Sequence, residues 1–121
     1  MTVKDQFNKE RLLTSIQKCR IHLTRIQFAT NQIKEFFPLT ADKYKSLTEA
    51  KIGNIDQLVF RFTKLQDEMG TNTFRFLLEC LQEDTIDKPF HDILNILERL
   101  HIIDSKDTWL SLRELRNVLA Q

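Results

Sequence analysis

The stretch DQFNKERLLTSIQKCRIHLTRIQFATNQIKEFFP, residues 5–38, decides the fold of this chain. Its apolar residues recur in alternating steps of four and three, the repeat of one face of a long helix in a coiled-coil-like bundle. The stripe consists of Leu12, Ile16, Cys19, Leu23, Ile26, Ile33 and Phe37. The spacing predicts a helix over residues 5–37. Pro38 ends it, because proline disfavours helical geometry in the residue before it and has no amide hydrogen.

A second apolar stripe predicts another helix over about residues 42–69, formed by Ile52, Ile55, Leu58, Phe62, Leu65 and Met69. The connection between the two helices is short, so the second helix must run back antiparallel to the first. We expect Gly53 to mark a close helix crossing or a point of fraying. We expect Gly70 to form a left-handed cap, with Thr71 or Asn72 capping the helix that follows.

Three shorter helices follow in the pattern. One is expected at about residues 72–82, one opens at Pro89 in its first turn, and one begins at about Lys106 after a cap by Asp104 or Ser105. In the last of these, the residues expected to face inward are Trp109, Leu112, Leu115 and Leu119. The predicted fold is therefore all-α, an antiparallel four- to five-helix bundle that forms a single domain over residues 1–121.

Composition narrows the classes of function. The chain is 41% hydrophobic and 29% charged, with two glycines and two prolines, which disfavours disorder and turn-rich β folds. Its net charge of +1 gives no overall field that would attract nucleic acid or membrane, so any binding patch must be local. No apolar run approaches the length needed to span a bilayer, and we expect a cytoplasmic protein without membrane contact.

Motifs of common enzymes are missing from the sequence. It contains no Gly-rich phosphate loop, no paired-histidine zinc motif and no nucleophile elbow, so we expect neither a metal nor a cofactor. His22, His91 and His101 lack ligand-spaced partners and are interpreted as helix-surface residues. The carboxylate pairs Asp67/Glu68 and Glu83/Asp84 are interpreted as solvated faces near helix ends.

The remaining candidate is LRELRNVLAQ, residues 112–121, a short amphipathic segment crowded with arginines. Together with LVFRFTKLQ, residues 58–66, it resembles the HEPN superfamily, in particular its HepT-like branch. That branch comprises bacterial helical-bundle toxins encoded beside a minimal nucleotidyltransferase antitoxin. The final helix of the family carries Arg, a polar residue that is often Asn, three further residues and then His. Arg116 and Asn117 match the first two positions.

The resemblance implies a metal-independent endoribonuclease that acts as a homodimer. Paired copies of the motif meet across a two-fold axis, where arginines hold the scissile phosphate and histidines move protons. The implied partners are RNA and the cognate nucleotidyltransferase. In this chain Gln121 occupies the position of the histidine, and an amide cannot exchange a proton near neutral pH. The resemblance therefore implies either a non-cleaving relative or a chain truncated or altered at its C-terminus.

The resemblance makes Arg116, Asn117 and Gln121 the candidate catalytic positions, and Arg113 and Arg61 are further candidates for RNA contact. Arg61 interrupts an apolar run, so we expect it to reach solvent or to pair with a carboxylate, Asp56 or Glu68. Two alternatives stay open. One is a non-catalytic module that binds RNA, nucleotide or substrate for a nucleotidyltransferase, and the other is a plain helical scaffold whose exposed apolar positions bind a partner.

Overall fold

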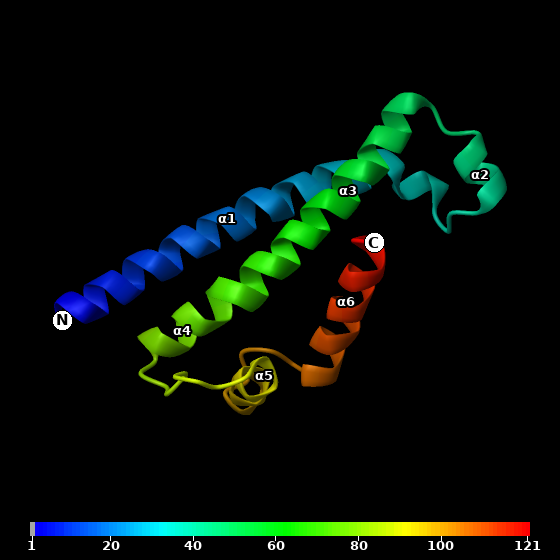
Figure 1. Ribbon diagram of the computed structural model, residues 1–121. Coiled ribbons are helices and arrows are strands. Elements are labelled where there is room, and N and C mark those ends of the chain that lie inside the picture. Colours follow the sequence, from blue (N-terminus) through cyan, green and yellow to red (C-terminus); the bar gives the residue numbers. More distant parts are fainter. Residues whose placement is uncertain (1) are drawn as a thin grey trace.

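A computed structural model describes residues 2–121, and within this range every regular element is a helix (Figure 1). The first, α1, spans Val3–Ile33 and is followed by a 3-10 turn at Lys34–Phe36. It begins with a capping box in which the Thr2 hydroxyl accepts from the amide of Asp5 at 3.0 Å and the Asp5 carboxylate accepts from the amide of Thr2 at 3.2 Å. The predicted long first helix is thus confirmed, and its helical geometry ends before Pro38.

The predicted second helix is interrupted near its start. A short helix, α2, spans Ala41–Lys45, and α3 spans Glu49–Glu68. At the break, the Ser46 hydroxyl donates to the carbonyl of Lys43 at 2.7 Å, while Thr48 caps α3 by accepting from the amide of Lys51 at 3.3 Å. These side chains satisfy backbone groups that a continuous helix would have paired internally, so the prediction of one helix over residues 42–69 is wrong at this point.

Gly70 does not end a helix. The chain passes from α3 through a π-helical turn, Met69–Thr73, directly into α4, Phe74–Cys80, and no glycine of residues 2–121 has a positive φ. The prediction of a left-handed cap, with a new N-terminus at Thr71 or Asn72, is therefore wrong. Continuing the helix places Phe74 and Leu78 in the core, and the wider turn absorbs the change in register.

Gly53 lies in the second turn of α3 and faces open space. A Cβ atom built there would meet nothing within 4 Å. The expected close helix crossing at Gly53 is therefore absent.

The last two helices begin close to the positions predicted from the sequence. Helix α5 spans Phe90–Arg99, and Pro89 occupies its N-cap, one residue before the predicted first-turn position. Helix α6 spans Lys106–Leu119, and the Ser105 hydroxyl caps it by accepting from the amide of Thr108 at 3.3 Å, as predicted.

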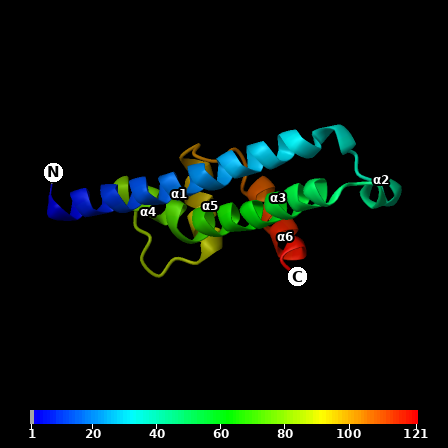
Figure 2. The ribbon, with the colours of Figure 1, turned by 90° about the horizontal axis from the view of Figure 1, so that it is seen from above.

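The arrangement of the helices is elongated (Figures 1 and 2). Helices α1 and α3 run antiparallel and side by side, and α6 packs on α3 and α5. The core lies where α4, α5 and α6 meet, and it contains Phe74, Leu78, Ile93, Leu94, Leu97 and Trp109. Within it the rings of Phe74 and Trp109 meet edge to face, with centroids 4.7 Å apart.

Most of the apolar face of α6 stays uncovered within one chain. Trp109 is buried as predicted, but Leu112, Leu115 and Leu119 are 38, 47 and 38% exposed, so their predicted inward orientation is wrong for the single chain. The reason is geometric, because α3 and α5 cover only one side of α6 and no other helix makes extensive contact with it.

Candidate functional site

The candidate site is built where the end of α6 meets the end of α3. Arg116 holds Asp67 of α3 through two parallel hydrogen bonds, from Nε to Oδ1 at 3.0 Å and from Nη2 to Oδ2 at 2.9 Å. This two-point geometry uses the planar guanidinium and carboxylate together. Hydrogen bonding to Asp67 raises the pKa of Arg116 above its ordinary value, so the guanidinium carries its charge throughout the working pH range.

Arg113 joins the same carboxylate from the preceding turn of α6. Its Nη1 lies 3.4 Å from Oδ1 of Asp67, because residues three apart share one face of a helix. Arg113 also lies against the π-helical turn, where a methyl group at Gly70 would be 3.7 Å from Nη1. Two guanidinium groups therefore share one carboxylate, and the cluster retains one positive charge. Asp67 is 38% exposed and the arginines 35 and 24%, so an anion in solvent can approach them.

Asn117 lies beside this cluster, whereas Gln121 makes no side-chain hydrogen bond with it. The Asn117 side-chain oxygen accepts from Nη1 of Arg116 at 3.4 Å. Gln121 is the second residue after the end of α6, is exposed, and donates its backbone amide to the carbonyl of Val118 at 3.4 Å. Of the residues singled out from the sequence, Arg113, Arg116 and Asn117 are thus brought together.

Arg61 belongs to a different face of α3. Its Nη1 lies 3.1 Å from Nδ1 of His22 on α1, and no carboxylate pairs with it among residues 2–121. The expectation of an Asp56 or Glu68 partner is therefore wrong, and His22 of α1, a half-buried residue, takes that place. Burial and the charge of Arg61 both lower the pKa of His22, which favours a neutral ring that accepts the hydrogen bond.

Asp67 and Glu68 are the residues that the sequence interpretation missed. They are consecutive, yet Asp67 binds α6 whereas Glu68 accepts a 2.7 Å hydrogen bond from Ser15 of α1. They hold opposite sides of the last turn of α3 and are not a solvated helix end. The sequence signal was limited to the two arginines on one helix face, which leaves open which acidic residue pairs with them.

Comparison with known proteins gives no further identification, because no family model, curated protein or solved structure matches the chain. Within residues 2–121, no group of three or more His, Cys, Asp or Glu side chains is arranged to hold a metal ion. None of the helices in that range combines the length and hydropathy that a membrane crossing requires.

Proposed function

We propose that the protein is a HepT-like HEPN component that binds RNA through the C-terminal half of α6. Arg116, assisted by Arg113, holds a backbone phosphate, and Asn117 keeps the Arg116 guanidinium oriented. Two features support the proposal: the family resemblance of residues 112–121, and the hydrogen bonds of Arg116 with Asp67 and Asn117.

One observation carries the proposal: two guanidinium groups converge on the single carboxylate of Asp67. The carboxylate of Asp67 neutralises only one of the two guanidinium charges. The second arginine leaves a positive charge at a partly exposed position, and a phosphate is the anion whose geometry suits a guanidinium fork. Asp67 fixes the guanidinium of Arg116 in advance, which reduces the entropy lost when a phosphate binds.

The residue at position 121 distinguishes between two proposed activities, RNA cleavage and RNA binding without cleavage. The family mechanism requires a group that exchanges a proton near neutral pH, and a glutamine amide does not. With Gln121 in place we infer RNA binding without cleavage. The second candidate, a non-catalytic module that presents RNA or substrate to a nucleotidyltransferase, is favoured by this same residue.

A two-fold dimer completes the proposed site. Leu112, Leu115, Val118 and Leu119 are between 38 and 57% exposed on the helix that carries Arg116. A second copy of α6 packed on this face would bring two Arg116 side chains toward one RNA strand.

The test is the affinity for a single-stranded RNA of mixed sequence, measured by fluorescence anisotropy at two salt concentrations. We expect Arg116→Ala to weaken binding roughly tenfold and to reduce the salt dependence, because one charged phosphate contact is lost. The matched control is Arg99→Ala, which removes the same charge from an exposed pair with Glu83. Circular dichroism checks that both variants stay folded.

Equal losses of RNA affinity in Arg116→Ala and Arg99→Ala would contradict the proposal, since binding would then depend on overall charge alone, and so would an unchanged affinity in Arg116→Ala. In that case Arg113 and Arg116 serve only to attach α6 to α3. Asp67→Asn would then lower the melting temperature as much as Arg116→Ala does, with no change in RNA affinity.

A second experiment separates the two candidate activities. Gln121→His places a group with a pKa near neutrality at the motif position. For the toxin-type nuclease we expect this variant to cleave RNA in the presence of EDTA, and the additional change Arg116→Ala to abolish the cleavage. Binding without cleavage in Gln121→His favours the non-catalytic module.

A further inference from the structure

Helix α1 carries exposed apolar side chains on the side that faces away from the rest of the chain. It forms one edge of the molecule, with α3 beside it and α6 on the far side of α3 (Figures 1 and 2). Leu13, Ile21 and Phe28 of α1 are 48, 57 and 59% exposed. The helix therefore has a second apolar face besides the one that packs against α3 and α4.

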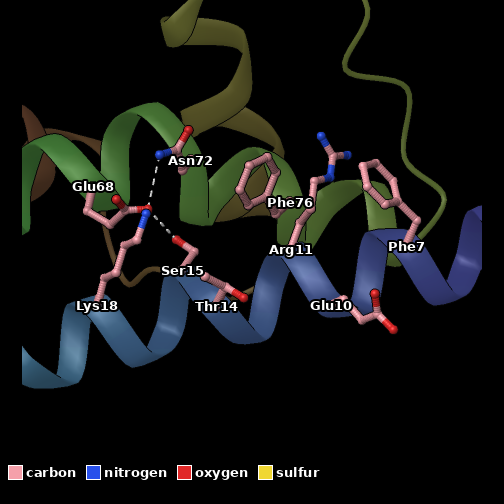
Figure 3. A pocket seen from close by; sticks show the side chains of 9 residues that line it. All are labelled: Phe7, Glu10, Arg11, Thr14, Ser15, Lys18, Glu68, Asn72 and Phe76. Carbon is pink, nitrogen blue, oxygen red and sulfur yellow. Dashed lines mark hydrogen bonds between the residues drawn. The ribbon is translucent and has the colours of Figure 1, made fainter.

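The packed face of α1 shows which way these residues point. Ser15 is 2% exposed, and its hydroxyl donates to Oε2 of Glu68 at 2.7 Å (Figure 3). A helix turns about 100° per residue, so Leu13, Ile21 and Phe28 lie about 120–160° round α1 from Ser15. They consequently form an outer face of α1 that no other segment covers.

The outer face has the spacing of a helix that packs along another helix. Ile21 and Phe28 are seven residues apart, and the exposed residues Thr14, Gln17 and Thr24 continue the same line in steps of three and four. Such a line is the seam of a coiled-coil pair. Because polar residues interrupt it, the single chain exposes no long continuous apolar patch there.

Two arginines flank this seam. Arg20 and Arg25 are exposed and belong to no ion pair within residues 2–121. Together with Ile21 and Thr24 they line a shallow hollow of about 290 Å³. Residues 12–33 of α1 contain no Asp or Glu. The flanking positions of a seam set the choice of partner through their charges, so this face selects an acidic partner.

Neighbouring charged groups do not cancel this positive charge. Arg61 and Lys64 lower the pKa of His22 and Glu68 raises it, which places these three α3 groups beside the middle of α1. Glu68 and Lys18 line the same cavity of about 370 Å³ (Figure 3), so this carboxylate offsets Lys18. The arginines that flank the seam keep their charge uncompensated.

We propose that the outer face of α1 binds an acidic amphipathic helix of a partner protein. Apolar side chains of that helix pack against Ile21 and Phe28, and Glu or Asp side chains beside its own seam pair with Arg20 and Arg25. This surface lies on a different helix from the arginine cluster of α6, and the proposal does not depend on RNA binding.

The features of the face argue against other occupants. A second copy of α1 would bring the flanking arginines of both chains together, and like charges in contact are unfavourable. Leu13 and Ile21 offer no flat ring on which a nucleic-acid base could stack. Gln17 and Thr24 interrupt the apolar surface that insertion into a lipid bilayer requires.

The test uses two synthetic peptides of about three heptads, with Leu at the seam positions and either Glu or Lys at the flanking positions. Like charges keep each peptide from pairing with itself. Fluorescence anisotropy measures their binding to the folded protein. We expect the Glu peptide to bind at least about tenfold more tightly than the Lys peptide, and more weakly as the salt concentration rises.

Reversal of the flanking charges should invert this preference. The double variant Arg20→Glu/Arg25→Glu is expected to bind the Lys peptide more tightly than the Glu peptide. The matched control is Lys4→Glu/Lys45→Glu, which changes the net charge equally at exposed positions away from the seam. It should keep the native preference, and so should Arg116→Ala.

The apolar contribution has its own variants. Ile21→Ala/Phe28→Ala should weaken the Glu peptide about tenfold, whereas Leu81→Ala, at a position that is 52% exposed after α4, should leave its affinity unchanged. Circular dichroism checks that every variant stays folded.

Three results would overturn the proposal. The first is the absence of saturable binding of the Glu peptide, and the second is equal affinity for the two peptides. The third is an equal change of preference in Arg20→Glu/Arg25→Glu and in its lysine control. If neither peptide binds, but phosphatidylglycerol vesicles or single-stranded RNA bind through Arg20 and Arg25, the face belongs to that ligand instead.

Discussion

At the scale of single residues, two neighbouring carboxylates in the last turn of α3 bind side chains of different helices. Asp67 accepts hydrogen bonds from the arginines of α6, and Glu68 accepts hydrogen bonds from Ser15 and Asn72. A helix turns about 100° per residue, so consecutive side chains reach different neighbours. The contacts with α6 and with α1 consequently lie at the same level of α3, on different sides of it.

His22 gives the pair with Arg61 a dependence on pH. Burial lowers the pKa of His22 most, and the charge of Arg61 lowers it further, so the unfolded chain binds a proton more readily than the folded one. Stability is therefore complete above the ordinary histidine pKa of about 6.5 and declines as the pH falls through that value. We expect urea midpoints to fall between about pH 7.5 and about pH 5.5.

The control for this effect is His22→Gln, whose amide oxygen can accept from Arg61 without titrating. The variant should lose less stability than the native protein over the same interval. Equal losses in the two proteins would show that other groups cause the dependence.

At this scale the sequence predicted that three candidate side chains lie close together. The spacing of Arg113, Arg116 and Asn117 on one helix was sufficient to group them, because helical geometry is local. Their partner Asp67 lies 49 positions before Arg116, and periodicity contains no information about which surfaces of two helices meet. Arg61 was misjudged for the same reason, since its partner His22 belongs to another helix.

At the scale of elements, Gly53 is a weak point in α3. The glycine lies inside the helix, and a Cβ there meets nothing within 4 Å. We expect Gly53→Ala to stabilise the protein by about 0.5–1 kcal/mol, because alanine loses less backbone entropy in a helix and no steric cost opposes the gain. Chemical denaturation measures the change.

Thr48→Ala is the informative counterpart, because it removes the N-cap of the same helix. It should destabilise the protein by about 1 kcal/mol, and Thr48→Ser should retain most of the native stability. If Gly53→Ala proves destabilising, α3 is not continuous through this position in solution.

At the scale of elements, the apolar pattern predicted some helix boundaries correctly and missed others. The apolar stripes identified α1, α5 and α6, whose ends are marked by local capping residues. Ser46 and Thr48 are of residue types that favour turns and caps, so a local signal for the interruption was present, although an apolar stripe does not encode it. Conversely, Gly70 resembles a stop signal, but the packing of Phe74 and Leu78 in the core overrides its local preference.

At the scale of the whole molecule, the apolar residues on one face of α6 are exposed to solvent in a single chain. We expect a homodimer, with a mass by light scattering of twice 14.4 kDa at micromolar concentration. Leu115→Lys should shift the protein toward the monomer, because it places a charge on this face. Ile86→Lys, at a loop position that is 79% exposed, is the matched control. A native mass of 14.4 kDa at all concentrations would contradict the dimer.

The central claim is that RNA contacts the arginines at the end of α6. The most direct measurement is a nuclear magnetic resonance titration of the folded protein with single-stranded RNA, following the Nε–H signals of its arginine side chains. The Nε–H group of Arg116 already donates to Asp67 at 3.0 Å, which favours an observable signal. We expect RNA to shift the signals of Arg116 and Arg113 progressively while that of Arg99 stays in place. Unchanged signals from Arg113 and Arg116 at an RNA concentration that saturates binding would contradict the claim.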